Sequence, residues 1–579
     1  MILSKKVSGI AASDGIGIAK AYLLVDPDLS FKKQTISDDA AEIKRLHASF
    51  DNSIEELKKI KQNAKASLGE DEVAVFDAHI AMLSDPDMIK QIEDEIKTDK
   101  VNAEQALVDV TTNFAETLAA MTDNKYMQER AADVKDISKR ALSHLLGKQL
   151  PNLALINSPV IIVAHEITPS DTSQMNKKYI KGMITDMGGR TSHSAIMSRT
   201  LEIPAVVGSE KATIEIANGD QLILDGLNGV AIVNPSQVEV SEYEQKATEF
   251  ATQKAEWAKL VDAPSVSKDG KQFEIAANIG TPADVDDALK AGADAVGLFR
   301  TEFLYMDSDS LPTEDQQFES YKKVAESMNG KPVVIRTMDI GGDKPLPYLP
   351  LPEEMNPFLG YRAIRISLDR QNIFRTQLRA LIRASKFGQL RIMFPMIATL
   401  DEFRKAKQVF MEEKQKLQQD APGLGDDIKL GIMIEIPAAA IFADQFAKEV
   451  DFFSIGTNDL IQYSFAADRG NDAVSYLYQP LNPALLRLIK HVIDSAHAEG
   501  KIAAMCGEMA GDQRALPLLL GMGLDEYSMS SSSILRSRSQ MRGLTTGECS
   551  TIVDEVLAKC QTADEVESLV NKRLTGVTQ

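Results

Sequence analysis

The sequence contains only three cysteines in 579 residues, Cys506, Cys549 and Cys560, and no two have the spacing of a metal-binding motif. An odd and sparse set excludes a disulfide framework and indicates a reducing, cytoplasmic compartment. No apolar run is long enough to span a bilayer, so membrane insertion is not expected. The first residues lack the hydrophobic core and small-residue cleavage site of a signal peptide, which predicts that the chain is not exported.

Basic residues are outnumbered in this sequence, with 64 Lys and Arg against 84 Asp and Glu and a formal net charge of −20. This charge would repel a polyanion, so nucleic acid is not an expected partner. A small anionic substrate would need clustered arginines that reverse the field locally. A basic protein partner, in contrast, would be attracted to the chain.

The chain is too long for one hydrophobic core, and changes of pattern along it predict several domains. Strand and glycine-turn patterns in 1–30 and 148–234 predict one α/β domain. Long helical periodicity with few glycines in 31–147 predicts an all-α bundle inserted into that domain, with a helix boundary at the Ser-Asp-Pro sequence of 84–86. A polar helical run in 235–262 predicts a connector.

Residues 263–579 show a regular alternation of short apolar, β-rich runs with helical segments. The eight runs read FEIAANIG, AVGLFRTE, PVVIRTMD, RIMFPMI, KLGIMIEIP, VDFFSIGTND, KIAAMCGE and DEYSMS. Nearly continuous apolar strands separated by helices are typical of a parallel sheet. Eight units in this length predict a closed (β/α)₈ barrel of the TIM type, with an open, doubly wound sheet as the alternative.

Polar side chains follow the predicted barrel strands at their carboxyl ends. They are Arg300, Arg336 with Asp339 behind it, Glu435, Asn458, Asp459, Cys506 and Glu508. Any one of them could merely cap a loop. Because active sites in such barrels lie at the carboxyl ends of the strands, so many charged or thiol side chains at one rim predict an active site.

The residue types at this rim indicate the chemistry. Arginines on neighbouring strands suit a small, multiply charged anion, because a guanidinium group pairs bidentately with phosphate or carboxylate. Arg469 could add a third cation or form a surface salt bridge. Glu435 and Asp459 supply two carboxylates, the usual protein share of a Mg²⁺ site completed by water and substrate oxygens. Cys506 could be an inert packed thiol or a proton donor to a carbanion or enolate carbon.

Residues 188–199 read GGRTSHSAIMSR and place His193 where a helix is expected to begin. A phosphoryl group on this imidazole would meet free backbone N–H donors and the positive end of the helix dipole. A lone histidine is more often structural, but the surrounding loop predicts nucleophilic catalysis with His193 as a phosphoryl carrier. The nearby polar residues that could bind or orient this group are Thr172, Arg190, Thr191 and Ser192.

Eight stretches of the sequence carry a family resemblance: GGRTSHSAIMSR, AVGLFRTEFL, RTMDIGGDK, NPFLGYRAIR, RIMFPMI, FFSIGTNDL, DRGND and MCGEMAGD. Together they resemble the Enzyme I family of the bacterial sugar phosphotransferase system, the phosphoenolpyruvate–protein phosphotransferases among the PEP-utilising enzymes. The resemblance runs nearly end to end and includes ERAADVKDISKR at 129–140 in the helical insert. It is weakest after residue 545, and no function is carried over to that tail.

The resemblance implies roles for individual residues. His193 corresponds to the phosphorylated residue, Cys506 to the proton donor that completes pyruvate, and Arg362 to a support for the substrate phosphate. Glu435 and Asp459 correspond to the Mg²⁺ ligands. The positions that correspond to phosphoenolpyruvate-binding residues are Arg300, Arg336, Asn458, Asp459 and Arg469.

The resemblance also implies partners and a reaction order. Phosphoenolpyruvate binds at the barrel mouth and phosphorylates His193, which then passes the group to the histidine-containing phosphocarrier protein (HPr) on the helical insert. The acidic stretch around 70–87 could receive that basic partner, with His79 as an interface or core residue. Homodimerisation through the barrel domain is implied as well. Since His193 must serve two partners in turn, large domain motion about the 235–262 connector is predicted.

Three alternatives remain open at the level of sequence. A nucleotide-dependent phosphoenolpyruvate synthase or dikinase would need a further ATP-binding domain, and the sequence has no glycine-rich nucleotide loop. A phosphoenolpyruvate-binding sensor would have no need of a phosphoryl acceptor such as His193 together with Cys506. A relative from a nitrogen-regulatory branch is expected to carry an additional N-terminal sensory domain.

Overall fold

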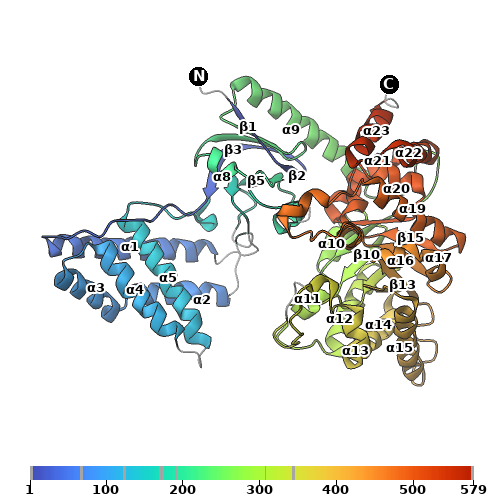
Figure 1. The fold of residues 1–579 in the computed structure, drawn as a ribbon, viewed down its shortest axis with the longest axis horizontal. Helices are drawn as coiled ribbons and strands as arrows, with labels where there is room; N and C mark the ends of the chain where they lie inside the picture. Colours follow the sequence, from blue (N-terminus) through green and yellow to red (C-terminus); the bar gives the residue numbers. More distant parts are fainter. Residues whose placement is uncertain are drawn as a thin grey trace. The chain divides into compact units, whose positions relative to one another are not determined.

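The computed structural model describes residues 4–64, 70–120, 125–167, 171, 175–189, 192–306, 308–341 and 346–575. The chain forms two compact units, Met1–Ala247 and Thr248–Gln579 (Figure 1). Within the described part of the chain, every helix is too short or too polar to cross a membrane.

The first unit is built on an eight-stranded sheet with the strand order β1-β8-β7-β3-β4-β5-β6-β2. The four central strands β3, β4, β5 and β6 run parallel, and the flanking strands pair antiparallel. Strand β4 is buried along its whole length, as expected for a strand covered on both faces. The strands are β1 Lys5–Ser8, β2 Ile10–Ser13, β3 Ile16–Leu24, β4 Val160–Ala164, β5 Ile180–Thr185, β6 Ala205–Val207, β7 Gln221–Asp225 and β8 Val230–Val233.

Five helices form the predicted insert between β3 and β4, which are neighbours in the sheet. They bury one apolar cluster that includes Leu46, Leu57 and Ile92. As predicted from the Ser-Asp-Pro sequence, α2 ends at Leu83 and α3 begins at Pro86, because the side chain of Asp85 caps α3 by accepting from two backbone N–H groups. The helices are α1 Asp39–Ala64, α2 Glu70–Leu83, α3 Pro86–Asp99, α4 Ala103–Ala119 and α5 Lys125–Leu145.

Among the described residues of the region that follows there are three further helices. Helix α7 (His193–Leu201) joins the parallel strands β5 and β6, and the short α8 (Ala212–Glu215) precedes β7. The polar run predicted as a connector is helix α9 (Gln237–Ala258), which buries none of its residues. A helix that is polar all round is typical of a segment that bridges two domains through solvent.

The second unit is a closed barrel of eight parallel strands, so the predicted (β/α)₈ fold is confirmed and the open sheet is wrong. Closure comes from the pairing of the last strand with the first, Glu526 to Met529 beside Glu274 to Ala277. The strands are β9 Glu274–Ile279, β10 Ala295–Arg300, β11 Val333–Arg336, β12 Leu390–Phe394, β13 Lys429–Ile434, β14 Phe452–Ile455, β15 Ile502–Met505 and β16 Glu526–Met529.

Helices cover the outside of the barrel (Figure 1). The serine-rich stretch near 530 becomes α21, and the tail after 545 becomes two helices, of which α22 packs against α20. The helices are α10 Asp284–Lys290, α11 Glu302–Met306, α12 Glu314–Ser327, α13 Ile364–Asp369, α14 Gln371–Ala384, α15 Leu400–Gln418, α16 Pro437–Ile441, α17 Ala443–Phe446, α18 Thr457–Phe465, α19 Pro483–Ala498, α20 Leu516–Met522, α21 Ser531–Arg542, α22 Thr546–Lys559 and α23 Ala563–Thr575.

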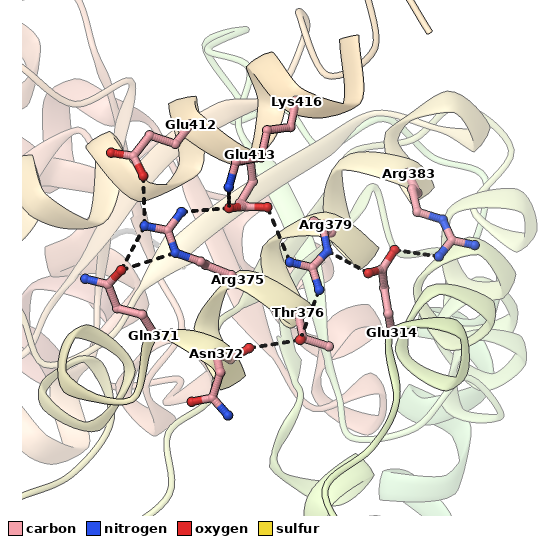
Figure 2. Close-up of polar contacts among 10 residues, drawn as sticks. All are labelled: Glu314, Gln371, Asn372, Arg375, Thr376, Arg379, Arg383, Glu412, Glu413 and Lys416. Carbon is pink, nitrogen blue, oxygen red and sulfur yellow. Dashed lines mark hydrogen bonds and ion pairs between the residues drawn. The ribbon is translucent and has the colours of Figure 1, made fainter. Parts of the chain in front are cut away.

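A buried carboxylate, Glu413 of α15, joins the helices α14 and α15 (Figure 2). Its side chain is 2% exposed and binds Arg375 at 2.6 Å, Arg379 at 3.3 Å and Lys416 at 2.7 Å. Burial opposes ionisation of Glu413, but these three cations outweigh it and lower its pKa. The ion pairs therefore stabilise the folded state at neutral pH and lose this effect as the pH falls below the ordinary carboxyl value of 4.5.

We expect Glu413→Gln to lower the free energy of unfolding by about 2 kcal/mol at pH 7, because two guanidinium groups lose a charged acceptor. The difference from wild type should shrink in acid, where the native carboxyl group is also neutral. Urea unfolding at pH 7 and at a series of lower pH values, continued until the native carboxyl group is protonated, measures both effects. Glu412→Gln is the matched control, since Glu412 is 40% exposed and pairs with Arg375 and Gln408. An equal loss in the control would contradict this prediction.

Candidate active site

His193 is the first residue of helix α7, as the sequence predicted. The helix follows β5, whose carboxyl end lies beside that of the parallel strand β4. Backbone hydrogen bonds from Asp186 to Ala164 and from Met187 to His165 extend this pairing beyond both strands. His193 therefore belongs to the carboxyl edge of a parallel sheet, the edge at which ligands bind in open α/β folds.

The loop before His193 has the geometry of a helix start. Ser192 is the N-cap, and its hydroxyl accepts from the N–H of Ala195 at 3.3 Å. Gly188 has φ +104°, and a side chain there would meet the Ser192 hydroxyl at 2.8 Å, so this position requires glycine. Ser192 is thus occupied as a cap. Thr172, Arg190 and Thr191, which were predicted to bind or orient a phosphoryl group, lie outside the described residues.

The predicted site residues of the barrel all lie at the carboxyl ends of strands. Arg300 and Arg336 are the last residues of the neighbouring strands β10 and β11. Glu435 and Cys506 directly follow β13 and β15. The remaining three residues come from the segment after β14, with Asn458 and Asp459 in the first turn of α18 and Arg469 in the loop beyond it.

Buried ion pairs connect two arginines of the rim to three carboxylates. Arg336 contacts Glu302 and Asp339, both at 3.0 Å. Asp339 also binds Arg362 at 2.9 Å, and Arg362 lies 3.6 Å from Asp459. Burial alone would lower the pKa of Arg336, but Glu302 and Asp339 outweigh it and raise the pKa, so the guanidinium stays charged. The arginines are therefore held in fixed orientations before any substrate is bound.

Several charged groups of this network have polar atoms left without a partner. Among the described residues, the buried Nε atoms of Arg336 and Arg362 donate no hydrogen bond, and Arg300 forms no ion pair. Within the same part of the chain, one carboxylate oxygen of Glu435 (Oε2) and one of Asp459 (Oδ1) accept no hydrogen bond. Unsatisfied buried polar atoms are costly unless a ligand completes them. The site therefore offers free donors for an anion and free acceptors for a cation.

The environment of Glu435 favours a bound cation. Its side chain is fully buried, and its other oxygen accepts from the N–H of Met396 at 2.5 Å. Burial and the nearby carboxylates of Asp459 and Asp339 raise the pKa of Glu435 to about 8. A positive charge between Glu435 and Asp459 would remove this repulsion. No third His, Cys, Asp or Glu completes a metal-binding group among the residues that the structure describes, so further ligands would be water or substrate oxygens.

The side-chain amide of Asn458 has a fixed orientation. Its Oδ1 accepts from the hydroxyl of Tyr478 at 3.0 Å and from the backbone N–H of Glu508 at 3.2 Å. Because a backbone N–H can only donate, the amide orientation is determined, and the NH₂ group is the one left for a substrate oxygen. Arg469 is half-buried, and its backbone N–H donates to Gln462 of α18 at 3.0 Å.

Cys506 lies inside the barrel, 3% exposed, in an apolar cluster with Leu298, Met433 and other lumen residues. Burial raises the pKa of its thiol to about 11, against the opposing effects of Ser454 and Arg336. The thiol is therefore protonated at neutral pH. A protonated thiol that contacts a cationic anion site is able to act as an acid, whereas a nucleophilic cysteine would need a lowered pKa.

Sequence patterns did not identify three residues that complete this geometry. Glu302 begins helix α11 just after strand β10 and pairs with Arg336. Tyr478 orients Asn458 from a loop 20 residues away. Tyr463 donates to the carbonyl of Phe358 at 2.6 Å and ties the loop before Arg362 to α18. Only the position of Glu302 at a strand end was a usable signal.

His79, predicted as an interface or core residue, is buried in the helical insert beside Asp133 at 3.2 Å.

Three family models match the chain: the N-terminal part of PEP-utilising enzymes at residues 8–130, their mobile domain at 156–229 and their PEP-binding domain at 254–546. The phosphoenolpyruvate-protein phosphotransferase of Latilactobacillus sakei is 61% identical over 98% of both chains. That of Enterococcus faecalis is 60% identical over 98% of this chain and all of the relative. A solution structure of Enzyme I is 38% identical over 42% of this chain and 99% of its own, with a TM-score of 0.34.

Proposed function

Because the chain belongs to the phosphoenolpyruvate–protein phosphotransferases of the PEP-utilising enzyme family, we propose that it transfers the phosphoryl group of phosphoenolpyruvate to its own His193 and then to HPr. It is an enzyme, and this reaction is the first step of the sugar phosphotransferase system. The observation that supports it best is the set of unsatisfied donors and acceptors at the barrel mouth, which suits an anion bound together with a cation.

Each residue of the barrel mouth has a proposed role in binding phosphoenolpyruvate. The guanidinium groups of Arg300 and Arg336 face the anionic phosphate and carboxylate groups, and the amide of Asn458 donates a further hydrogen bond. Arg469 adds a cation from the loop after α18. Arg362 supports the phosphate from behind, through the carboxylate of Asp339 that it shares with Arg336. Asp459 would help to hold the divalent cation.

The reaction breaks the bond between phosphorus and the enol oxygen and forms a bond between phosphorus and a nitrogen of His193. Charge that develops on the transferred group is stabilised by the fixed guanidinium groups. The enolate that leaves is protonated at carbon by the thiol of Cys506, which yields pyruvate. The phosphoryl group on His193 then moves to a histidine nitrogen of HPr, so the imidazole is regenerated.

We propose that the divalent cation is Mg²⁺ and that Glu435 and Asp459 hold it. When bound, it would neutralise charge on the substrate phosphate and carboxylate oxygens. Two observations support this site: each carboxylate has an oxygen that accepts no hydrogen bond from the described residues, and burial together with the carboxylate of Asp459 raises the pKa of Glu435 to about 8.

Glu435→Gln is expected to raise the concentration of Mg²⁺ needed for half-maximal phosphorylation by at least about tenfold, because one anionic ligand is lost. Direct binding of Mn²⁺ should weaken in parallel. Glu526→Gln is the matched control: Glu526 is equally buried and also has a pKa raised to about 8, but it begins strand β16 at the opposite end of the barrel. Unchanged Mn²⁺ binding by the Glu435 variant would refute this assignment.

The proposal includes partners and location. HPr docks on the helical insert, and homodimers form through the barrel unit. His193 moves between the barrel mouth and the docked HPr by motion about the connector at 235–262. Helix α9, with no buried residue, supports such a connector. Ile441 and Phe442, 67% and 49% exposed at the end of α16, are available for a subunit contact. Three buried cysteines without disulfides support a cytoplasmic location.

The proposed function is tested by incubating the protein with phosphoenolpyruvate labelled with ³²P at the phosphate, in the presence of Mg²⁺ and without ATP. We expect label on the protein that is acid-labile and base-stable, as for phosphohistidine, and its complete transfer to added HPr. A sensor would bind phosphoenolpyruvate without retaining label. A requirement for ATP would instead indicate a nucleotide-dependent enzyme.

A further inference from the structure

A buried glutamine, Gln377 of helix α14, binds Met338, which lies two residues after the substrate-binding Arg336, and Thr301, whose hydroxyl binds the carbonyl of Arg336. It is 1% exposed, and all three of its side-chain hydrogen bonds are made inside the barrel unit. No motif or strand end marks it in the sequence. We propose that Gln377 is a positioning residue for phosphoenolpyruvate binding, which acts by fixing the backbone that carries Arg336 and Asp339. This inference rests on the proposed function.

The hydrogen bonds of Gln377 have a determined direction. Its Oε1 accepts from the N–H of Met338 at 2.9 Å, and a backbone N–H can only donate. Its NH₂ group therefore faces the other way and donates to the hydroxyl of Thr301 at 3.2 Å and to that of Tyr321 at 3.1 Å. The Thr301 hydroxyl in turn donates to the carbonyl of Arg336 at 2.9 Å. Each donated hydrogen in this group has one acceptor, so the hydrogen bonds have a single arrangement.

These contacts hold the segment where β11 ends and the active-site loop begins. Arg336 is the last residue of the strand, and Met338 precedes Asp339, the carboxylate shared by Arg336 and Arg362. The N–H of Thr337 still donates to the backbone carbonyl of Met393 at 3.0 Å, but the buried N–H groups of the next two residues, Met338 and Asp339, donate to side chains. Gln377 satisfies the N–H of Met338 directly and supports the carbonyl of Arg336 through Thr301.

Helix α14, which carries Gln377, is held in place by arginines that pair with the neighbouring helices (Figure 2). Arg375 and Arg379 both bind Glu413 of α15, and Arg379 and Arg383 both bind Glu314 of α12. The pairs to Glu314 are 2.7 Å long. Helix α14 is therefore tied on two sides, and rotation or sliding that would withdraw Gln377 from Thr301 and Met338 is opposed by these ion pairs.

A second buried glutamine provides a matched control. Gln317 of α12 is also 1% exposed and belongs to the same hydrogen-bonded group, where it accepts from Tyr321 at 3.0 Å. Its NH₂ group donates to the carbonyl of Pro312 at 3.0 Å. None of its hydrogen bonds reaches Arg336, Met338 or Thr301. Replacing either glutamine by methionine removes a buried amide of the same size, but only one of the two replacements frees the backbone beside Arg336.

The test is steady-state pyruvate formation by the full chain with Mg²⁺ and saturating HPr, measured for wild type, Gln377→Met and Gln317→Met. We expect the KM for phosphoenolpyruvate to rise about tenfold in Gln377→Met, with kcat reduced less than about threefold, because a binding group is misplaced. Gln317→Met should keep the wild-type KM although its thermal midpoint falls by a similar amount. An equal KM in both variants, or a change in kcat alone, would overturn the inference.

A double-mutant cycle with Thr301→Val tests the route through the hydroxyl. If Gln377 acts partly through Thr301, the two substitutions together should raise KM by less than the product of their separate effects. Fully multiplicative effects would refute this route. Failure of the proposed function would look different, since wild type itself would then form no labelled phosphohistidine and no pyruvate from phosphoenolpyruvate.

Discussion

Replacing His193 with alanine is expected to abolish phosphoryl transfer completely, both to the protein and onward to HPr. The transferred group has no other covalent acceptor in the proposed mechanism, so the loss should exceed the effect of any other single substitution. The start of α7 places His193 at the carboxyl edge of the parallel strands, and the first turn of a helix is a position that favours phosphoryl oxygens. The measurement is ³²P retained by the protein after incubation with labelled phosphoenolpyruvate.

His165→Ala is the appropriate control for this experiment. His165 follows β4 at the same edge of the sheet, its side chain is 70% exposed, and it lies 3.4 Å from Asp186. A variant that lacks it should still take up label in full. Uptake that persists in His193→Ala, or that disappears in His165→Ala while His193 is intact, would overturn the assignment of the phosphorylated residue.

The second large effect is expected for Cys506→Ala, which should reduce pyruvate formation by a factor of about 10² to 10⁴. The enolate released from phosphoenolpyruvate needs a proton at carbon, and the buried thiol is the proposed donor. Substrate binding should change little, because the arginines of the site are oriented by Glu302 and Asp339 rather than by the thiol. Pyruvate release and equilibrium binding of phosphoenolpyruvate, measured on the same preparation, separate the two effects.

The pH dependence gives an independent check of this role. Burial raises the pKa of Cys506 to about 11, so the donor should remain protonated at every pH below about 10 and lose its proton only above that. A fall of pyruvate formation with a midpoint near pH 8.5 would indicate an unshifted thiol and contradict the burial argument. Cys549→Ala serves as control, since Cys549 is a fully buried cysteine on α22 in the outer helical layer. It should cost stability without changing the rate of protonation.

Much of the barrel and its rim could be predicted from local pattern alone. Buried parallel strands read as apolar runs, and the first polar residue after each run lies at the same end of the barrel as all the others. Arg300, Arg336, Glu435 and Cys506 were identified in this way, and each does follow or end a strand. The start of helix α7 at His193 was predictable for a similar reason, because cap residues and glycines act within a few positions of one another.

The pairing of these groups depended on the tertiary structure. Arg362 binds Asp339 and also approaches Asp459, which lies more than 90 residues later in the sequence. Tyr478 orients the amide of Asn458 from a separate loop. Gln377 reaches the strand end from a helix whose periodicity marks only a buried position.

The sequence by itself determined which residue types stand at the barrel rim and at the helix start, because strand and helix periods assign side chains to faces over short distances. Only the folded chain decided which donors and acceptors remain unsatisfied, and therefore where an anion and a cation can bind. That outcome depends on strand register and on the packing of helices that are distant in sequence, and neither leaves a local signal.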